Sequence, residues 1–169
     1  AVIRPKVLTT VSPAPPPLGS TLRLQTQTHT RLRPEHKHTA TLEAIHARRT
    51  ARQAGFDDAL YVDGEGLISE GSLWNIGFLR GDTVVWPQAP MLAGVAQALI
   101  DRGLAGQGMN SRTRPVHTNE LSAFDGAFIC NSATPACAVT AICDVDFEID
   151  DARLQRLRAA WASAPLQPI

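Results

Sequence analysis

Lysine and cysteine are both scarce in this sequence. The lysines are Lys6 and Lys37, so chemistry that needs a titratable primary amine has two candidate side chains. The cysteines are Cys130, Cys137 and Cys143; they are odd in number, lack the spacing of a zinc ribbon and alternate with apolar residues. We therefore expect them to pack as small buried side chains, and we expect neither a disulfide framework nor a metal site.

The sequence also lacks a net charge, a membrane-length apolar run and a signal-peptide pattern at its start. Its 16 basic and 16 acidic residues balance, which removes the electrostatic argument for nucleic acid because phosphate binding needs a basic surface. The longest apolar runs are far too short to span a bilayer. We expect a cytoplasmic protein without nucleic-acid or membrane partners. Its apolar share of 44% suits one globular domain with a sizeable core.

The stretch from Leu60 to Phe78, LYVDGEGLISEGSLWNIGF, has the most informative pattern. A short apolar strand leads into a glycine-rich turn over residues 63–66, and a return strand follows. Glu70 interrupts the small and apolar residues of that return strand. The pattern predicts a hairpin that carries a carboxylate toward its inner face.

The rest of the chain predicts strands and helices in alternation. A half-buried strand is expected over residues 22–30 from its alternating pattern, and a helix over 39–54, closed by Gly55. Further strands are expected over 83–86, 114–117, 127–131 and 137–143. Gly94 should open a second helix, and a helical turn over 119–123 and a final amphipathic helix over 150–162 should follow.

Three features could bind an anion or react with a carbonyl, and each also has an ordinary interpretation. Lys37 lies just ahead of a helix, where a plain solvated lysine is the common alternative. Gly94 opens a helix whose free N–H groups suit phosphate, although many helices begin in this way. Ser132 and Thr134 offer hydroxyl groups, which turns also use.

Taken in order, these segments resemble a known family. PEHKHTATLEAIHARRTARQAGFDDALYVDGEGLISEGSLWNIGF, LAGVAQALI and FICNSATPACAV are similar to the large C-terminal domain of class IV, or fold type IV, pyridoxal-phosphate (PLP) enzymes. The resemblance runs from about Pro34 to Val139. It implies an α/β (α+β) fold, with a mixed sheet or pseudo-barrel and flanking helices, and it implies PLP as cofactor.

The resemblance also assigns roles to individual residues. Lys37 falls on the lysine that forms the Schiff base with PLP, and Glu70 on the acid that faces the pyridine nitrogen. The chemistry needs a nucleophilic amine and a carboxylate that favours a protonated ring. The other cofactor-binding positions are Leu92 against the ring, the helix start at Gly94, Val95 and Ala96, and a second phosphate-binding loop at Ser132 and Ala133. Asn75 matches a residue that we interpret as structural support.

The family implies a domain division that this chain fills only in part. We assign residues 1–36 to a proline-rich interdomain linker and entry strand, and residues 37–169 to the PLP-binding C-terminal domain. Family members have a smaller N-terminal domain that covers the cofactor, and we expect it to be missing here. For the chain as it stands we expect weak PLP binding and little turnover. The resemblance also implies a homodimer.

Within the family, the resemblance favours an aminotransferase that moves an amino group between an amino acid and a 2-keto acid. Aminodeoxychorismate lyase, which forms 4-aminobenzoate, is the close alternative because KH at 37–38, AGV at 93–95 and ICN at 129–131 are similar to it. A non-catalytic relic of the fold is the third hypothesis. Two departures bear on the choice: Ala96 replaces a common threonine, and Leu42 replaces the tyrosine of branched-chain enzymes.

Overall fold

The computed structural model describes residues 6–13 and 19–165. Its strands are β1 (Thr21–Thr28), β2 (Asp58–Val62), β3 (Ile68–Gly71), β4 (Asn75–Arg80), β5 (Thr83–Pro87), β6 (Asn110–Arg114), β7 (Gly126–Asn131), β8 (Thr134–Ile142) and β9 (Val145–Asp146). Its helices are α1 (Leu42–Gln53), α2 (Val95–Gly103) and α3 (Asp151–Ala162), with short 3-10 turns η1 (Ala105–Gln107) and η2 (Thr118–Ala123). Within the described residues, each helix is too short or too polar to cross a bilayer.

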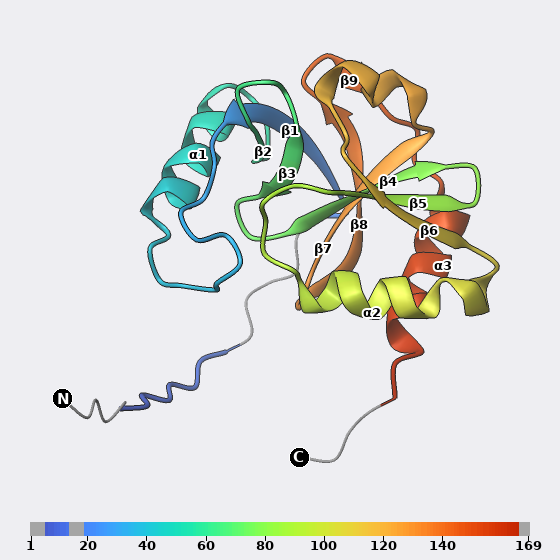
Figure 1. Ribbon diagram of the computed structural model, residues 1–169, viewed down its shortest axis with the longest axis horizontal. Coiled ribbons are helices and arrows are strands. Elements are labelled where there is room, and N and C mark those ends of the chain that lie inside the picture. Colours follow the sequence, from blue (N-terminus) through green and yellow to red (C-terminus); the bar gives the residue numbers. More distant parts are fainter. Residues whose placement is uncertain (1–5, 14–18, 166–169) are drawn as a thin grey trace.

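The strands form one mixed sheet that closes into a ring. The order runs β3-β2-β1-β8-β7-β4, and a further pairing between β3 and β4 joins the two ends. β5 and β6 continue the sheet outward from β4, and β9 pairs with β8. β1 lies parallel to both β2 and β8, whereas the hairpin neighbours are antiparallel. The expected mixed sheet with a pseudo-barrel and flanking helices is therefore confirmed (Figure 1).

Side chains alternate between the interior of the ring and the helix-covered outer face. In β7, Ala127 and Ile129 belong to the interior cluster, whereas Phe128 and Cys130 pack in the cluster that includes α2 and α3. A strand covered on both faces reads as a continuous apolar run. This explains why the sequence AFIC shows no polar alternation although it is a strand.

The helices cover the sheet from two sides. α2 and α3 lie side by side and pack on the outer face of β7 and β8, while α1 packs on β2 (Figure 1). Ala47 and Ala51 of α1 meet Ala59 and Tyr61 of β2 in a separate small cluster. Cys130 and Cys137 are buried, as the sequence predicts, and Cys143 is partly buried.

Three predicted elements differ from the structure. The single return strand of the hairpin is two strands, because Ser72 and Trp74 turn inward to bond the buried carboxylate of Asp58 and interrupt the pairing. The strand predicted over 114–117 is found only at its ends: β6 stops at Arg114, Pro115 follows without an amide donor, and His117 makes an isolated bridge to Leu67. The first helix begins at Leu42 instead of residue 39.

The predicted linker over residues 1–36 is described only in part. Residues 6–13 form no strand, and β1 begins at Thr21. The proline-rich core of that linker falls largely in residues 14–18, which lie outside the described residues.

Candidate active site

A cleft of about 770 Å³ opens at the edge of the ring between α1 and the start of α2. Its walls come from the loop after β1, the corner between β3 and β4, the segment before α2 and the turn between β7 and β8. Seven of the eight predicted site residues line it: Lys37, Glu70, Leu92, Gly94, Val95, Ala96 and Ser132. Ala133 lies in the adjoining turn, outside the lining residues.

Glu70 is the buried acid of the cleft, with an exposed fraction of 4%. One carboxylate oxygen, Oε1, accepts a hydrogen bond from Arg31 Nη1 at 2.9 Å, and Oε2 accepts from the main-chain N–H of Leu92 at 3.2 Å. Burial raises the pKa of Glu70, whereas Arg31, the Leu92 amide and Lys37 each act to lower it. The carboxylate is thus held in place by two hydrogen-bond donors while solvent is kept away.

Lys37 reaches the same cleft from an exposed loop between β1 and α1. The residues on either side of it tie this loop together. The main-chain N–H of His36 donates to the Arg33 carbonyl at 3.0 Å, and His38 Nε2 bonds the Leu32 carbonyl at 2.9 Å. The loop therefore presents the amine from a closed turn of main chain.

Arg31 is a site residue that the sequence analysis missed. Its side chain is 19% exposed, and it contacts both Glu70 and the carbonyl oxygen of His36. The one available signal is that an arginine follows a half-buried strand six positions before Lys37. A periodicity argument cannot tell such a residue from an ordinary surface arginine.

Asn75 fixes the segment that leads into α2, which agrees with its predicted supporting role. Its Nδ2 donates to the carbonyl of Leu92 at 2.9 Å. A β-carbon on Gly94 would lie 2.0 Å from Asn75 Oδ1, so only glycine fits where the two segments meet. α2 then starts without a side-chain cap, and its first N–H groups are free to bind an anion.

The turn between β7 and β8 is organised by Asn131. Its Oδ1 accepts from the main-chain N–H groups of Ala133 and Thr134 at 3.0 and 2.8 Å. Its Nδ2 donates to the carbonyl of Leu73 across the cleft wall at 3.3 Å. Ser132 remains exposed at the tip of this turn and faces the cleft. The Ala133 amide is thus already bonded within the turn.

Asp58 is a second residue that the sequence analysis missed. It is 2% exposed, and its Oδ2 accepts hydrogen bonds from Ser72 Oγ and Trp74 Nε1, both at 3.0 Å. Ser72 and Trp74 form the corner of the cleft between β3 and β4. An acid at the start of the otherwise apolar run ALYV was the available signal.

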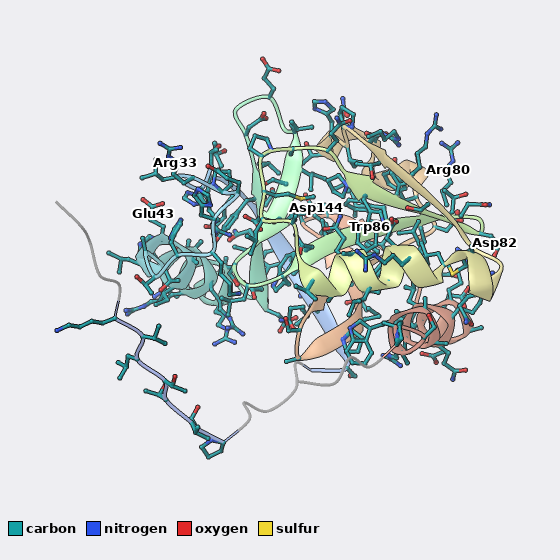
Figure 2. The ribbon with its side chains drawn as sticks, turned by 60° about the horizontal axis from the view of Figure 1, so that its bottom comes forward. Arg33, Glu43, Arg80, Asp82, Trp86 and Asp144 are labelled. Carbon is teal, nitrogen blue, oxygen red and sulfur yellow. The ribbon has the colours of Figure 1, made fainter. Side chains whose placement is uncertain are left out.

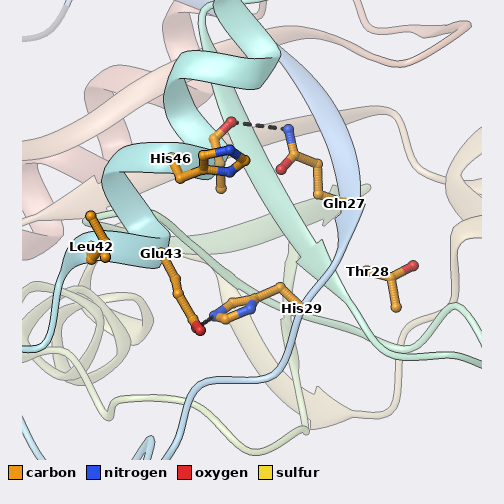
Figure 3. Close-up of a pocket in the computed structure, with 7 residues that line it drawn as sticks. Gln27, Thr28, His29, Leu42, Glu43 and His46 are labelled. Atoms are coloured by element: carbon orange, nitrogen blue, oxygen red, sulfur yellow. Dashed lines mark hydrogen bonds and ion pairs between the residues drawn. The ribbon is translucent and has the colours of Figure 1, made fainter.

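A smaller hollow of about 380 Å³ adjoins the cleft on the α1 side. His29 and Glu43 line both, and His29 Nε2 lies 3.4 Å from Glu43 Oε2 (Figure 3). Glu43 and Arg33 lie on the α1 side of the molecule, far from Arg80 and Asp82 (Figure 2).

Among the described residues, no group of three or more His, Cys, Asp and Glu side chains is arranged to hold a metal ion.

The residues of the cleft fit PLP. An amine, a buried carboxylate and an uncapped helix start line one space, and these match the aldehyde, ring nitrogen and phosphate of that cofactor. The Gly94 position is closed against any side chain by Asn75, which keeps the main chain at the surface of the cleft. The chain's own residues therefore offer one partner for each of these three groups of the cofactor.

Comparison with known proteins also points to a PLP-enzyme family. The family model described as amino-transferase class IV matches residues 1–142. A curated relative, the probable branched-chain-amino-acid aminotransferase of Rickettsia felis, is 30% identical over 91 residues, which cover 53% of this chain and 31% of the relative.

Solved structures share the fold at low identity. A fold IV transaminase from Curtobacterium pusillum gives a TM-score of 0.76 at 23% identity, and covers 84% of this chain and 52% of its own. A putative 4-amino-4-deoxychorismate lyase from Legionella pneumophila gives 0.75 at 22%, with 82% and 54% covered. A PLP-bound hypothetical aminotransferase from Mycobacterium tuberculosis gives 0.76 at 16%, with 84% and 56% covered. The chain thus spans about half the length of these structures, and the expected fold type IV is confirmed.

Proposed function

The chain belongs to the amino-transferase class IV family, and from that premise we propose that it binds PLP and transfers an amino group between an amino acid and a 2-keto acid. These small molecules are the partners that we propose. The observation that carries the proposal is the cleft itself, which places Lys37, Glu70 and the start of α2 around one space. The homodimer and the cytoplasmic location stay predictions.

Each residue would have a distinct task toward the cofactor. PLP, when bound, supplies an electron sink for the electron pair of the substrate's α-carbon. Lys37 Nζ would bind the aldehyde. It would then hold and move the proton of the substrate's α-carbon, as general base and acid. The Glu70 carboxylate would accept a hydrogen bond from the ring nitrogen and so keep that nitrogen protonated. Leu92 would pack against the ring.

The phosphate would be bound by main-chain and hydroxyl donors. The free N–H groups of Val95 and Ala96 at the start of α2 point a positive partial charge at the cleft. The Ser132 hydroxyl lies in the same lining and would add a donor. Because Ala96 carries no hydroxyl, main-chain donors would supply most of this binding.

The test is chemical trapping on the two lysines of the chain. The purified protein is mixed with PLP, reduced with borohydride and digested, and the phosphopyridoxyl group is located by mass spectrometry. We expect it on Lys37, with the modification lost in Lys37→Ala and kept in the matched control Lys6→Ala. Label spread evenly over Lys6 and the N-terminus, and unchanged in Lys37→Ala, would instead support the non-catalytic relic.

Aminodeoxychorismate lyase is the second candidate, and the similarity to the Legionella pneumophila structure favours keeping it. The two activities differ in what they need from a second substrate. A transaminase passes the amino group to a 2-keto acid, whereas the lyase releases pyruvate and 4-aminobenzoate from aminodeoxychorismate without an acceptor. Incubation with either substrate, followed by product analysis, separates them.

A further inference from the structure

One guanidinium group joins the acid and the amine sides of the cleft. Arg31 Nη1 donates to Glu70 Oε1 at 2.9 Å, and Arg31 Nη2 donates to the carbonyl oxygen of His36 at 3.1 Å. His36 directly precedes Lys37. The planar fork of arginine can make two such bonds with a fixed angle between them, which a lysine ammonium cannot reproduce.

The bridge is shielded from water at its acid end. The side chain of Arg31 is 19% exposed and that of Glu70 is 5% exposed. An ion pair in such a place is screened far less than a surface pair. Losing one partner would leave the other charge buried and uncompensated, which is costly.

Arg31 is the main counter-charge of Glu70. Arg31 and Lys37 both lower the pKa of Glu70, and Arg31 has the larger effect. The pKa of Tyr61, a buried phenol on β2, is raised chiefly by burial and further by the charges of Asp58 and Glu70. Burial acts against ionisation of Glu70, so the ionised acid depends on its cationic neighbours.

The bridge also ties the Lys37 loop to the sheet. Two further bonds, from His36 to Arg33 and from His38 to Leu32, join residues 32–38 to one another. They close the loop but do not attach it to β3. The bond from Arg31 to Glu70 supplies that attachment.

We propose that Arg31 is a positioning residue, whose guanidinium fixes the Glu70 carboxylate and the main chain beside Lys37 to each other. Acid and amine thereby keep a set relation before any ligand arrives. The roles given to Glu70 and Lys37 rest on the proposed function. The bridge itself is a property of the chain, so its test needs no cofactor.

The test measures charge and geometry separately in the protein without added PLP. ¹³C NMR of labelled glutamate side chains follows the titration of Glu70, which is assigned with Glu70→Gln. Hydrogen exchange follows the amides of residues 32–38. The variants are Arg31→Gln and Arg31→Lys. The matched control is Arg33→Gln, because Arg33 belongs to the same loop and its side chain is 75% exposed.

Arg31→Gln should raise the pKa of Glu70 and accelerate exchange of the loop amides about tenfold, as expected for loss of a hydrogen bond from a charged donor. Arg31→Lys keeps a positive charge, so it should restore much of the Glu70 titration while loop exchange stays fast. If Arg31→Gln matches Arg33→Gln in either quantity, the proposal is wrong.

Should Arg31→Gln fail to fold, Arg31→Lys decides the question. Loop exchange faster than in Arg33→Gln then supports the bridge, and equal exchange overturns it. Because these measurements use no PLP, a failure of the trapping experiment on Lys37 leaves them unaffected. A failed bridge would in turn leave trapping on Lys37 unaffected.

Discussion

Glu70 and Asn75 face each other across β3 and β4, and their pairing closes the ring of strands. The same two residues hold the segment before α2. Glu70 accepts from the Leu92 N–H, and Asn75 donates to the Leu92 carbonyl. The position at which the sheet closes therefore also supplies the two side chains that hold the segment before α2.

The first prediction concerns Gly94, whose missing side chain lets this segment lie against Asn75. Gly94→Ala would place a β-carbon 2.0 Å from Asn75 Oδ1. We expect a loss of about 2 kcal/mol in the free energy of unfolding, typical of overpacking, together with weaker PLP binding as the start of α2 shifts. Urea denaturation and absorbance titration with PLP measure the two effects.

The control for Gly94 is Gly106→Ala, because a β-carbon at Gly106 meets no atom within 4 Å. Its stability should stay within about 0.5 kcal/mol of the parent protein. Equal behaviour of the two variants in both assays would show that Asn75 does not restrict the segment.

The second prediction concerns Asp58, the buried acid that holds the corner of the cleft. Asp58→Ala removes the acceptor for Ser72 Oγ and Trp74 Nε1 and leaves both donors buried. We expect unfolding to become easier by about 3 kcal/mol, because buried donors lose a charged partner. The urea midpoint and its slope give this value.

Glu65→Ala provides the comparison for Asp58, since Glu65 is an exposed acid in the turn between β2 and β3. We expect it to change stability by less than about 0.5 kcal/mol. A similarly small effect of Asp58→Ala would mean that Ser72 and Trp74 are held by their packing alone.

The third prediction is a pH dependence that arises from Glu70. Burial raises its pKa in the folded chain above the unfolded value of about 4.3. The folded state therefore binds the Glu70 proton more tightly than the unfolded state does. The resulting stabilisation is fully present at pH values below the unfolded pKa, and it is lost as pH rises through the folded pKa. The stability of the parent protein minus that of Glu70→Gln should fall over this window.

Taking a difference isolates Glu70 from other acids. Asp63, Glu120 and Asp125 have lowered pKa values, so they stabilise the fold as pH rises, but they are common to both proteins and cancel. Urea unfolding of each protein between about pH 4 and 8 gives the difference. A difference that grows with pH would contradict the raised pKa of Glu70.

The sequence predicted local structure well where turn chemistry was explicit. Gly55 ends the first helix region with a φ of +85°, and the 63–66 turn lies where its glycines indicate. The final helix, predicted over 150–162, runs from Asp151 to Ala162 and is capped by Asp150, whose side chain accepts from the Arg153 N–H. These features depend on neighbours along the chain, which a sequence displays directly.

What the sequence could not predict depends on partners far away in the chain. The break between β3 and β4 requires Asp58, which lies 14 positions from Ser72 and 16 from Trp74. The tie between Arg31 and Glu70 spans 39 positions. The resemblance supplied Lys37, Glu70 and the helix start, whereas the residues that orient them became visible only with the packing.

The position of β1 between β2 and β8 has a consequence for how the chain folds. Leu22 pairs with Val139, so one edge of this strand lacks its neighbour until residues 134–142 have been synthesised. Pairings so distant in sequence are slow to form, because a long loop must close before they contribute. On a ribosome, the ring should therefore complete only after β8 emerges, and until then β1 would offer an open strand edge to chaperones or to aggregation.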